Sequence, residues 1–210
     1  MRQARICGIG HRRNRGRRRP APATHDDLVR RRFVADAPDR LWCTDSTEHP
    51  TGGGTVYLAC VEDVFSRQIV GWSIADHMRS ELVVDALQMA TWRRPPAAGT
   101  VVHRPGGPNT PSGCSGTGSA PPGLLGSMGR VASSVDNCLI ESFFSTLQRE
   151  LLDTRRWTSR AELGSAIFEW IEAWYNPRRR HTALGNLSPV DYEHQLQARQ
   201  ALHTTAEPAA

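Results

Sequence analysis

Residues 55–74, TVYLACVEDVFSRQIVGWSI, decide the fold class of this chain. They hold two runs rich in apolar and β-branched residues, Thr55–Val64 and Gln68–Ile74, separated by a brief turn. Three glycines precede the first run, and before them a shorter apolar run, Leu41–Thr44, ends at Asp45. Short apolar runs bounded by turn residues are typical of strands that pair with their neighbours in the chain. The stretch therefore predicts three strands in an antiparallel meander.

Beyond this meander the spacing of apolar residues becomes helical. Ser80–Trp92 carries apolar residues at 82, 83, 86, 87 and 90, which fall on one face of a helix. A short strand is predicted at Thr100–His103, and amphipathic helices at Asn137–Thr154 and Arg160–Tyr175. A last helix is expected to start at Ser188 and Pro189. Strands followed by a helix, a strand and more helices indicate an α/β or α+β domain with a mixed sheet.

Composition limits the class of protein. A length of 210 residues with 39% hydrophobic residues suits one domain with extensions. No apolar run approaches the roughly 20 residues that span a bilayer, and the N-terminus lacks the apolar segment of a secretory signal. The five cysteines form no CxxC pair, which favours free thiols in a reducing compartment. We therefore expect a cytoplasmic protein, associated with the bacterial nucleoid and without a membrane partner.

Positive charge is concentrated at the start of the chain. Residues 1–32 hold eleven arginines and two aspartates, a net charge of +9, whereas the whole chain has a net charge of +5. We interpret residues 1–34 as an extended arm that is either a solvated tail or a nucleic-acid-binding segment, because clustered arginines bind phosphate by counterion release. The arginines of the dense run that we assign to nucleic acid are Arg12, Arg13, Arg17, Arg18 and Arg19.

Residues 104–123 break the pattern of the rest of the chain. The segment RPGGPNTPSGCSGTGSAPPG consists almost entirely of glycine, proline, serine and threonine. Its composition predicts a flexible loop. A structureless loop of this length inside a compact domain is itself unusual, so the segment needs a separate explanation.

Five separated stretches resemble, in the expected order, the insertion-sequence transposases whose core is similar to retroviral integrases. The resemblance covers about residues 28–195 and implies an RNase H-like α/β fold, a five-stranded mixed sheet flanked by helices. We accordingly expect a catalytic core at 35–195 and a flexible tail at 196–210. The stretches are WCTDSTEHPT (42–51), YLACVEDVFSRQIVGWSI (57–74), GSMGR (126–130), DNCLIESFFSTLQREL (136–151) and WYNPRRRHTALGNLSPVDYE (174–193).

The resemblance implies a metal-dependent site built from two aspartates and one glutamate. Asp45 matches the first family aspartate and Glu141 matches the family glutamate, while Asp63 is typical of the family but structural. In strand transfer between phosphodiesters, one divalent metal activates the attacking oxygen and another stabilises the leaving oxygen. Carboxylates suit Mg²⁺ because it prefers hard oxygen ligands, and Mn²⁺ is the alternative metal.

The position of the second family aspartate is occupied by Pro105. Counting back from Glu141 by the spacing typical of the family leads to Pro105, and proline cannot bind a metal. The nearest polar residues, His103 and Asn109, are poor substitutes for a bridging carboxylate. We therefore expect impaired metal binding and little or no strand transfer by this chain.

A frameshift explains both the odd composition and the missing aspartate. Codons exist for Arg104, Pro105 and Gly106 that, shifted by one base, encode the Asp-Arg-Gly expected in the family. We hypothesise that residues 104–123 lie between two compensating insertions or deletions, with the family frame resuming near Leu124. The segment would then lack a helix that normally covers part of the sheet. A genuine insertion would add length, and the preserved spacing to Glu141 argues against it.

The resemblance also suggests where DNA binds. Arg149 stands beside Gln148, the position of a basic, DNA-contacting residue in the family, and the run Arg178, Arg179, Arg180 and His181 matches the family's basic segment. Such transposases usually carry an N-terminal helix-turn-helix region, of which residues 1–34 resemble only the end. They generally act as homo-oligomers on paired element ends and target DNA.

Three functions fit these observations. The first is a DDE-type DNA transposase core, inactive in this copy if Pro105 is genuine. The second is a non-catalytic DNA-binding remnant of a transposase. The third, a nuclease for RNA–DNA hybrids, shares the fold, but the stretch from Tyr175 to Tyr192 favours a transposase.

Overall fold

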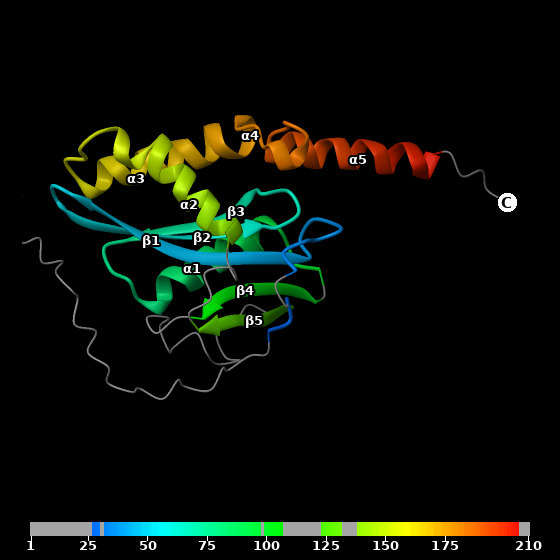
Figure 1. Ribbon diagram of the computed structural model, residues 1–210, viewed down its shortest axis with the longest axis horizontal. Coiled ribbons are helices and arrows are strands. Elements are labelled where there is room, and N and C mark those ends of the chain that lie inside the picture. The colour runs from blue at the N-terminus through cyan, green and yellow to red at the C-terminus, as the bar shows by residue number, and fades with distance from the viewer. Residues whose placement is uncertain (1–26, 30–31, 98, 107–122, 132–137, 206–210) are drawn as a thin grey trace, which may run out of the picture.

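The computed structural model describes residues 27–29, 32–97, 99–106, 123–131 and 138–205. It contains one five-stranded mixed sheet with the strand order β3-β2-β1-β4-β5. Helix α1 covers one face of the sheet, and the C-terminal helices lie along the other (Figure 1). The predicted mixed α/β sheet flanked by helices is therefore confirmed. The strands are β1 (Leu41–Thr51), β2 (Gly54–Asp63), β3 (Ile69–Ala75), β4 (Thr100–Gly106) and β5 (Leu124–Val131), and the helical segments are α1 (Ser80–Arg93), α2 (Cys138–Glu150), η3 (Leu152–Thr154), α3 (Arg160–Glu169), η4 (Trp170–Tyr175), α4 (Asn176–Arg178), η5 (Thr182–Leu184) and α5 (Pro189–Thr205).

Strands β1, β2 and β3 form the expected antiparallel meander, but β1 is longer than its apolar run. It pairs with β2 from Trp42, opposite Asp63, as far as Thr51, opposite Gly54. The polar half of β1 has no apolar pattern of its own and is extended because its backbone pairs with β2. Asp45 therefore lies inside a strand, and the expectation that the strand ends at Asp45 was wrong.

The other half of the sheet is parallel. Strand β4 lies beside β1 with His103 opposite Cys43, and β5 lies parallel to β4. The β4–β5 register shifts between Arg104 and Gly106, the two residues that flank Pro105. Proline lacks a backbone N–H, so within a sheet it is tolerated where the hydrogen-bond ladder is interrupted.

The two faces of the sheet bury separate apolar cores. Leu41 and Cys43 of β1 and Cys60 of β2 belong to the core under α2, α3 and η4. Trp42 and Ala59, the neighbours of these residues in the chain, belong to the core under α1. Successive side chains of a strand point to opposite faces. Odd-numbered residues of β1 and even-numbered residues of β2 therefore face α2.

The C-terminal helical segments differ from the predicted pair of long helices. Helix α2 ends at Glu150, and the predicted helix over residues 160–175 changes to π-helical winding over its last six residues, Trp170–Tyr175. Helix α5 continues to Thr205, so residues 196–205, which we expected in a flexible tail, are helical. None of the described helices is long and apolar enough to cross a membrane.

Asn176, directly after the π-helical segment, is bonded to the edge strand β3. Its side-chain Oδ1 accepts a hydrogen bond from Ile69 N at 2.9 Å, and its Nδ2 donates to Ile69 O, also at 2.9 Å. Asn176 is buried, so both bonds are shielded from water. This pair of bonds fixes the start of the basic run Arg178–His181 relative to the sheet.

The described part of the expected N-terminal arm packs on the parallel half of the sheet. Leu28 N donates to Ser127 Oγ at 3.0 Å, Val29 is buried, and the Phe33 ring lies 5.3 Å from the ring of His103. The expectation of an extended arm therefore does not hold for this part. Other predicted features lie outside the described residues. They are the arginine run from Arg12 to Arg19 and most of the glycine- and proline-rich segment, including Asn109.

Close packing of α1 on β3 depends on Gly71. A Cβ atom at Gly71 would lie 2.2 Å from Ala86 O and 2.7 Å from Ala90 N, both backbone atoms of α1. We predict that Gly71→Ala lowers the free energy of unfolding by about 1–3 kcal/mol, because the helix must move away from the strand. Urea denaturation measures the change.

Gly164→Ala is the matched control for this prediction. A Cβ atom at Gly164, within α3, would meet only Ile74 Cδ1 at 3.9 Å. Alanine favours helix over glycine by about 1 kcal/mol, so this variant should be neutral or stabilised. Equal denaturation midpoints for Gly71→Ala and the parent protein would contradict the packing argument.

Candidate active site and the pocket beside it

Asp45 lies on the face of the sheet that α2 covers. It shares this face with Cys43, two residues earlier in β1, and its Cα partner on β2 is Cys60. The carboxylate is half-buried, and its Oδ1 accepts a hydrogen bond from Ser46 N at 2.8 Å. The first predicted carboxylate is therefore held within a paired strand rather than in a mobile turn.

Glu141 lies in the first turn of α2, which packs directly on β1. Ile140, Phe143 and Leu147 bury one side of this helix in the core, and Glu141, next to Ile140 in the chain, stays exposed. The structure therefore presents Asp45 and Glu141 on the same face of the sheet, one from the central strand and one from the helix above it.

Pro105 lies on the neighbouring strand, β4. Cys43 and His103 are partners across the parallel pair β1–β4, and Asp45 and Pro105 each follow two residues later. The paired residues of β1 and β4 run from Leu41 and Val101 to Cys43 and His103, and the β4–β5 register shifts between Arg104 and Gly106. Pro105 thus lies just beyond the paired part of these two strands.

The described residues do not provide the ligands of a two-metal site. No group of three or more His, Cys, Asp or Glu side chains that could hold a metal ion occurs among them. His103 is buried, its Nδ1 is 3.1 Å from Ser127 Oγ, and its ring contacts Phe33. A ring held in this way is part of the packing between β4 and β5 and does not replace the missing carboxylate.

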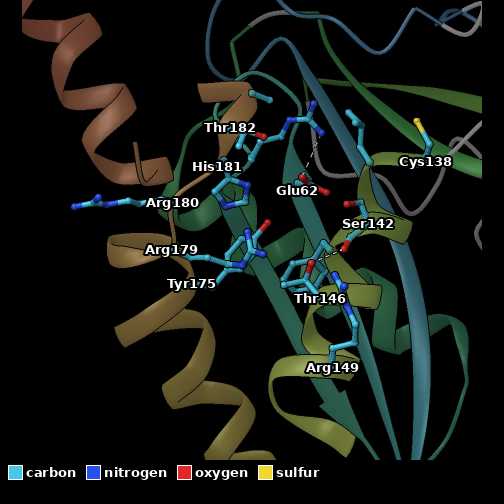
Figure 2. A pocket seen from close by; sticks show the side chains of 14 residues that line it. Glu62, Cys138, Ser142, Thr146, Arg149, Tyr175, Arg179, Arg180, His181 and Thr182 are labelled. Carbon is cyan, nitrogen blue, oxygen red and sulfur yellow. Dashed lines mark hydrogen bonds and ion pairs between the residues drawn. The ribbon is translucent and has the colours of Figure 1, made fainter. Parts of the chain in front are cut away.

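The predicted basic run is divided between the interior and the surface. Arg178 and Arg180 are exposed, and Arg180 points away from the neighbouring pocket (Figure 2). Arg179 forms an ion pair with Glu150 at 3.1 Å. His181 is half-buried, and burial followed by the charge of Arg179 lowers its pKa to about 4, so its imidazole is neutral at pH 7.

The two candidate residues at the end of α2 also differ. The Gln148 side chain donates to Asp153 Oδ1 at 2.6 Å. Arg149 is exposed, and its Nε donates to Ser145 O at 3.2 Å. Within the described residues Arg149 has no carboxylate partner, which leaves its charge available to an anion.

Asp63 has the structural role that the sequence predicted. Its Oδ2 accepts from Asp39 N at 2.6 Å, and its Oδ1 accepts from Phe65 N at 2.8 Å and Ser66 N at 3.0 Å. These bonds shape the turn between β2 and β3. Burial raises the pKa of the Asp63 carboxyl, and the backbone hydrogen bonds oppose the shift.

A pocket that the sequence analysis did not predict lies between α2 and the π-helical segment. Its volume is about 500 Å³, and Glu62 of β2 lines it (Figure 2). Glu62 is only 2% exposed, its ion pair with Arg67 is long at 3.9 Å, and burial raises its pKa from 4.5 to about 8. The inward position of Glu62 could have been predicted from the sequence. Leu58 and Cys60 are buried on the face that α2 covers, and side chains alternate along a strand, so Glu62 faces the same way.

The five-stranded mixed sheet with helices on both faces is the architecture of an integrase-type core. Models of the integrase core domain match residues 35–109 and 123–189. The transposase of insertion sequence element IS904 from Lactococcus lactis is 39% identical over 176 residues, 84% of this chain and 70% of that protein. The chain belongs to the insertion-sequence transposases with an integrase core, as the sequence motifs predicted.

Other relatives agree with this assignment. The transposase of IS629 from Shigella sonnei is 38% identical over 80% of this chain and 56% of its own length. Transposase InsF of IS3fB from Escherichia coli K12 is 36% identical over 81% of this chain and 59% of its own length. The chain therefore spans a little over half of these two relatives. All three relatives are transposases, which gives no support to a hybrid-specific nuclease.

Solved structures share the fold at low identity. A chain of the simian T-cell lymphotropic virus intasome, in complex with PP2A regulatory subunit B56 gamma, matches 75% of this chain and 55% of its own, with a TM-score of 0.56 at 15% identity. The HTLV-2 integrase catalytic core domain in complex with magnesium matches 76% of this chain and 99% of its own, with a TM-score of 0.52 at 14% identity. These matches confirm the integrase-like architecture.

Burial of Glu62 predicts a stability difference that depends on pH. Because the folded-state pKa of about 8 exceeds the ordinary 4.5, the folded protein binds the Glu62 proton more tightly across this range. The contribution of Glu62 to the free energy of unfolding therefore falls as the pH rises from about 5 to about 8. Glu62→Gln should remove this decline.

Urea titrations of the parent protein and Glu62→Gln across this pH range measure the effect. The difference between them isolates Glu62 from His181, whose lowered pKa gives an opposite slope between about pH 4 and 6.5. A difference that stays constant with pH would show that Glu62 titrates normally in the folded state.

Proposed function

We propose that this chain is the catalytic core of a cut-and-paste DNA transposase, in which Asp45 and Glu141 are the two retained metal-binding carboxylates. The observation that carries this proposal is their convergence on one face of the sheet, Asp45 from β1 and Glu141 from α2. The relatives are transposases, and the similar HTLV-2 core was solved with magnesium, which supports Mg²⁺, or Mn²⁺ in its place, as the metal.

We further propose that strand transfer is lost in the chain as written. Pro105 lies on β4, the strand that pairs with β1, so the described residues contribute two carboxylates where the family uses three. Losing a ligand should weaken metal binding by at least the roughly 10–100-fold that loss of an outer partner costs. The protein would then retain DNA binding without catalysis, which is the alternative of a DNA-binding remnant.

The arginines of the basic run support DNA binding. Arg178 and Arg180 are exposed, whereas Arg179 is paired with Glu150 and fixes the segment to α2. We propose that the two exposed guanidiniums contact DNA phosphates and that the arginines Arg12 to Arg19 add a sequence-independent contact. Homo-oligomerisation on DNA ends also remains a proposal, supported by the similarity to a chain of an intasome.

Sequencing the DNA that encodes residues 100–126 tests the frameshift hypothesis directly. An aspartate codon in place of Pro105, followed by a family-like helix, would make this chain an ordinary transposase core. A confirmed Pro105 codon with no family-like segment in the shifted frames would reject the frameshift and leave the inactive core.

Activity assays test the metal-site proposal. We predict that the parent protein joins pre-cut DNA ends in Mg²⁺ or Mn²⁺ no better than Asp45→Asn does, and that Pro105→Asp binds Mn²⁺ at least tenfold more tightly than the parent. Isothermal titration measures metal affinity, and a radiolabelled oligonucleotide measures joining. Glu48→Gln, an exposed β1 carboxylate, is the control for lost charge. Robust joining by the parent protein would overturn the proposed loss of activity.

DNA affinity tests the role of the exposed arginines. Arg178→Gln and Arg180→Gln should each weaken binding similarly for unrelated duplex sequences and reduce the slope of log affinity against log salt by about 1. Arg79→Gln, exposed at the start of α1, removes the same charge from the opposite face and should leave the slope unchanged. Fluorescence anisotropy measures the DNA affinity, and salt concentrations from about 50 to about 200 mM are enough to determine the slope. Equal slopes for all three variants would place the DNA elsewhere.

A further inference from the structure

The pocket around Glu62 adjoins the candidate active site through α2. Cys138, Ser142, Thr146 and Arg149 all line it, and they succeed one another along one side of the helix. Glu141 is next to Ser142 in the chain and less than one turn from Cys138, so the pocket opens beside the candidate catalytic carboxylate. A ligand in this pocket would lie next to any DNA strand that reaches Glu141.

Two buried polar atoms in or beside this pocket lack partners. Within the described part of the chain, Glu62 Oε2 and His181 Nε2 are buried and have no hydrogen bond. Glu62 is 2% exposed, and Figure 2 shows its carboxyl in the space between His181 and Ser142. Buried polar groups are nearly always hydrogen-bonded, so two unmatched atoms at one cavity point to a ligand that supplies the missing partners.

The charged residues of the pocket differ between its inner end and its outer end. Among the residues that line it, Glu62 is the acidic one and lies at the inner end on the sheet, 3.9 Å from Arg67, whereas Arg149 comes from α2 and Arg179 directly follows α4. Arg149 extends along α2 near Thr146 (Figure 2) and has no carboxylate partner among the described residues. The pocket therefore suits a ligand with N–H donors at one end and a negative charge at the other.

We propose that this pocket binds a single unstacked nucleotide of the DNA, with the phosphate at Arg149 and an exocyclic amino group of the base donating to Glu62. The proposal rests on the proposed DNA-binding function and deepens it. A volume of about 500 Å³ lies within the range of small-molecule sites, about 300–1,000 Å³. Adenine, cytosine and guanine offer Glu62 an exocyclic amino group, whereas thymine offers only its ring N3–H between two carbonyl oxygens, so Glu62 would favour the amino-bearing bases.

A free anion fits the same residues less well. An inorganic phosphate would satisfy Arg149 but would leave Glu62 Oε2, at the inner end of the pocket, unmatched. An amino group matches the oxygen in either protonation state of the carboxyl, because a carboxyl oxygen accepts an N–H in both. The base, and not the phosphate alone, therefore accounts for the position of Glu62.

Binding of mononucleotides to the full chain tests this proposal without DNA joining or metal. We expect dCMP to bind about tenfold more tightly than dTMP, since dCMP offers an amino donor to the buried oxygen where dTMP has a carbonyl oxygen, which cannot donate. Glu62→Met keeps a side chain of similar length without the acceptor and should abolish this preference. Arg149→Gln should weaken both nucleotides about equally, whereas Arg156→Gln, an exposed arginine outside the pocket, should change neither.

Titration by NMR, with inorganic phosphate as the comparison ligand, gives the decisive outcomes. Equal binding of dCMP, dTMP and phosphate would overturn the nucleotide assignment in favour of a plain anion site. No binding of any nucleotide, in a protein that still binds duplex DNA, would overturn the pocket proposal and leave the proposed function intact. A cytosine preference in a protein that fails to join DNA would support the pocket independently of catalysis. Thermal unfolding of Glu62→Met, with Glu62→Gln as a second variant, confirms that loss of binding does not reflect misfolding.

Discussion

The alternation of side chains along β1 governs both the core and the candidate site. Trp42 points towards α1, while Leu41, Cys43 and Asp45 point towards α2. A shift of one residue in the β1–β2 register would turn Asp45 away from Glu141 and move Trp42 from the core under α1 to the core under α2. The burial of apolar residues in β1 therefore also fixes the orientation of the carboxylate, so stability and function constrain the same register.

The parallel pairing of β1 with β4 extends this constraint to Pro105. In the parallel register that starts at Leu41, positions 45 and 105 each lie two residues beyond the partners Cys43 and His103. The proposed loss of a carboxylate therefore concerns a position directly after this pairing. The described ladder is also interrupted at the proline, which suggests that the sheet accommodates this residue through a local defect and not through a change of topology.

Local patterns predicted much of the fold, and non-local contacts account for most differences. The β-branched runs around residues 55–74 were sufficient for the meander, and the helical spacing after Ser80 was sufficient for α1. The polar half of β1 was missed because its extended form depends on β2. The π-helical winding was missed because it has no sequence period of its own. The convergence of Asp45 and Glu141 was available only from the family resemblance, whereas the inward position of Glu62 was visible in the alternation of β2 but was not interpreted.

The bond pair between Asn176 and Ile69 has a consequence for how copies of this protein can associate. Strand β3 is an outer strand, and an outer strand offers its free backbone groups to any extended chain. The Asn176 amide carries one donor and one acceptor, and it occupies the N–H and C=O of Ile69 as a neighbouring peptide group would. The Asn176 side chain thus makes the two hydrogen bonds to Ile69 that the backbone of a further strand would make. Addition of a foreign strand at this position would first have to displace a buried amide, so the sheet is closed there to edge-to-edge growth.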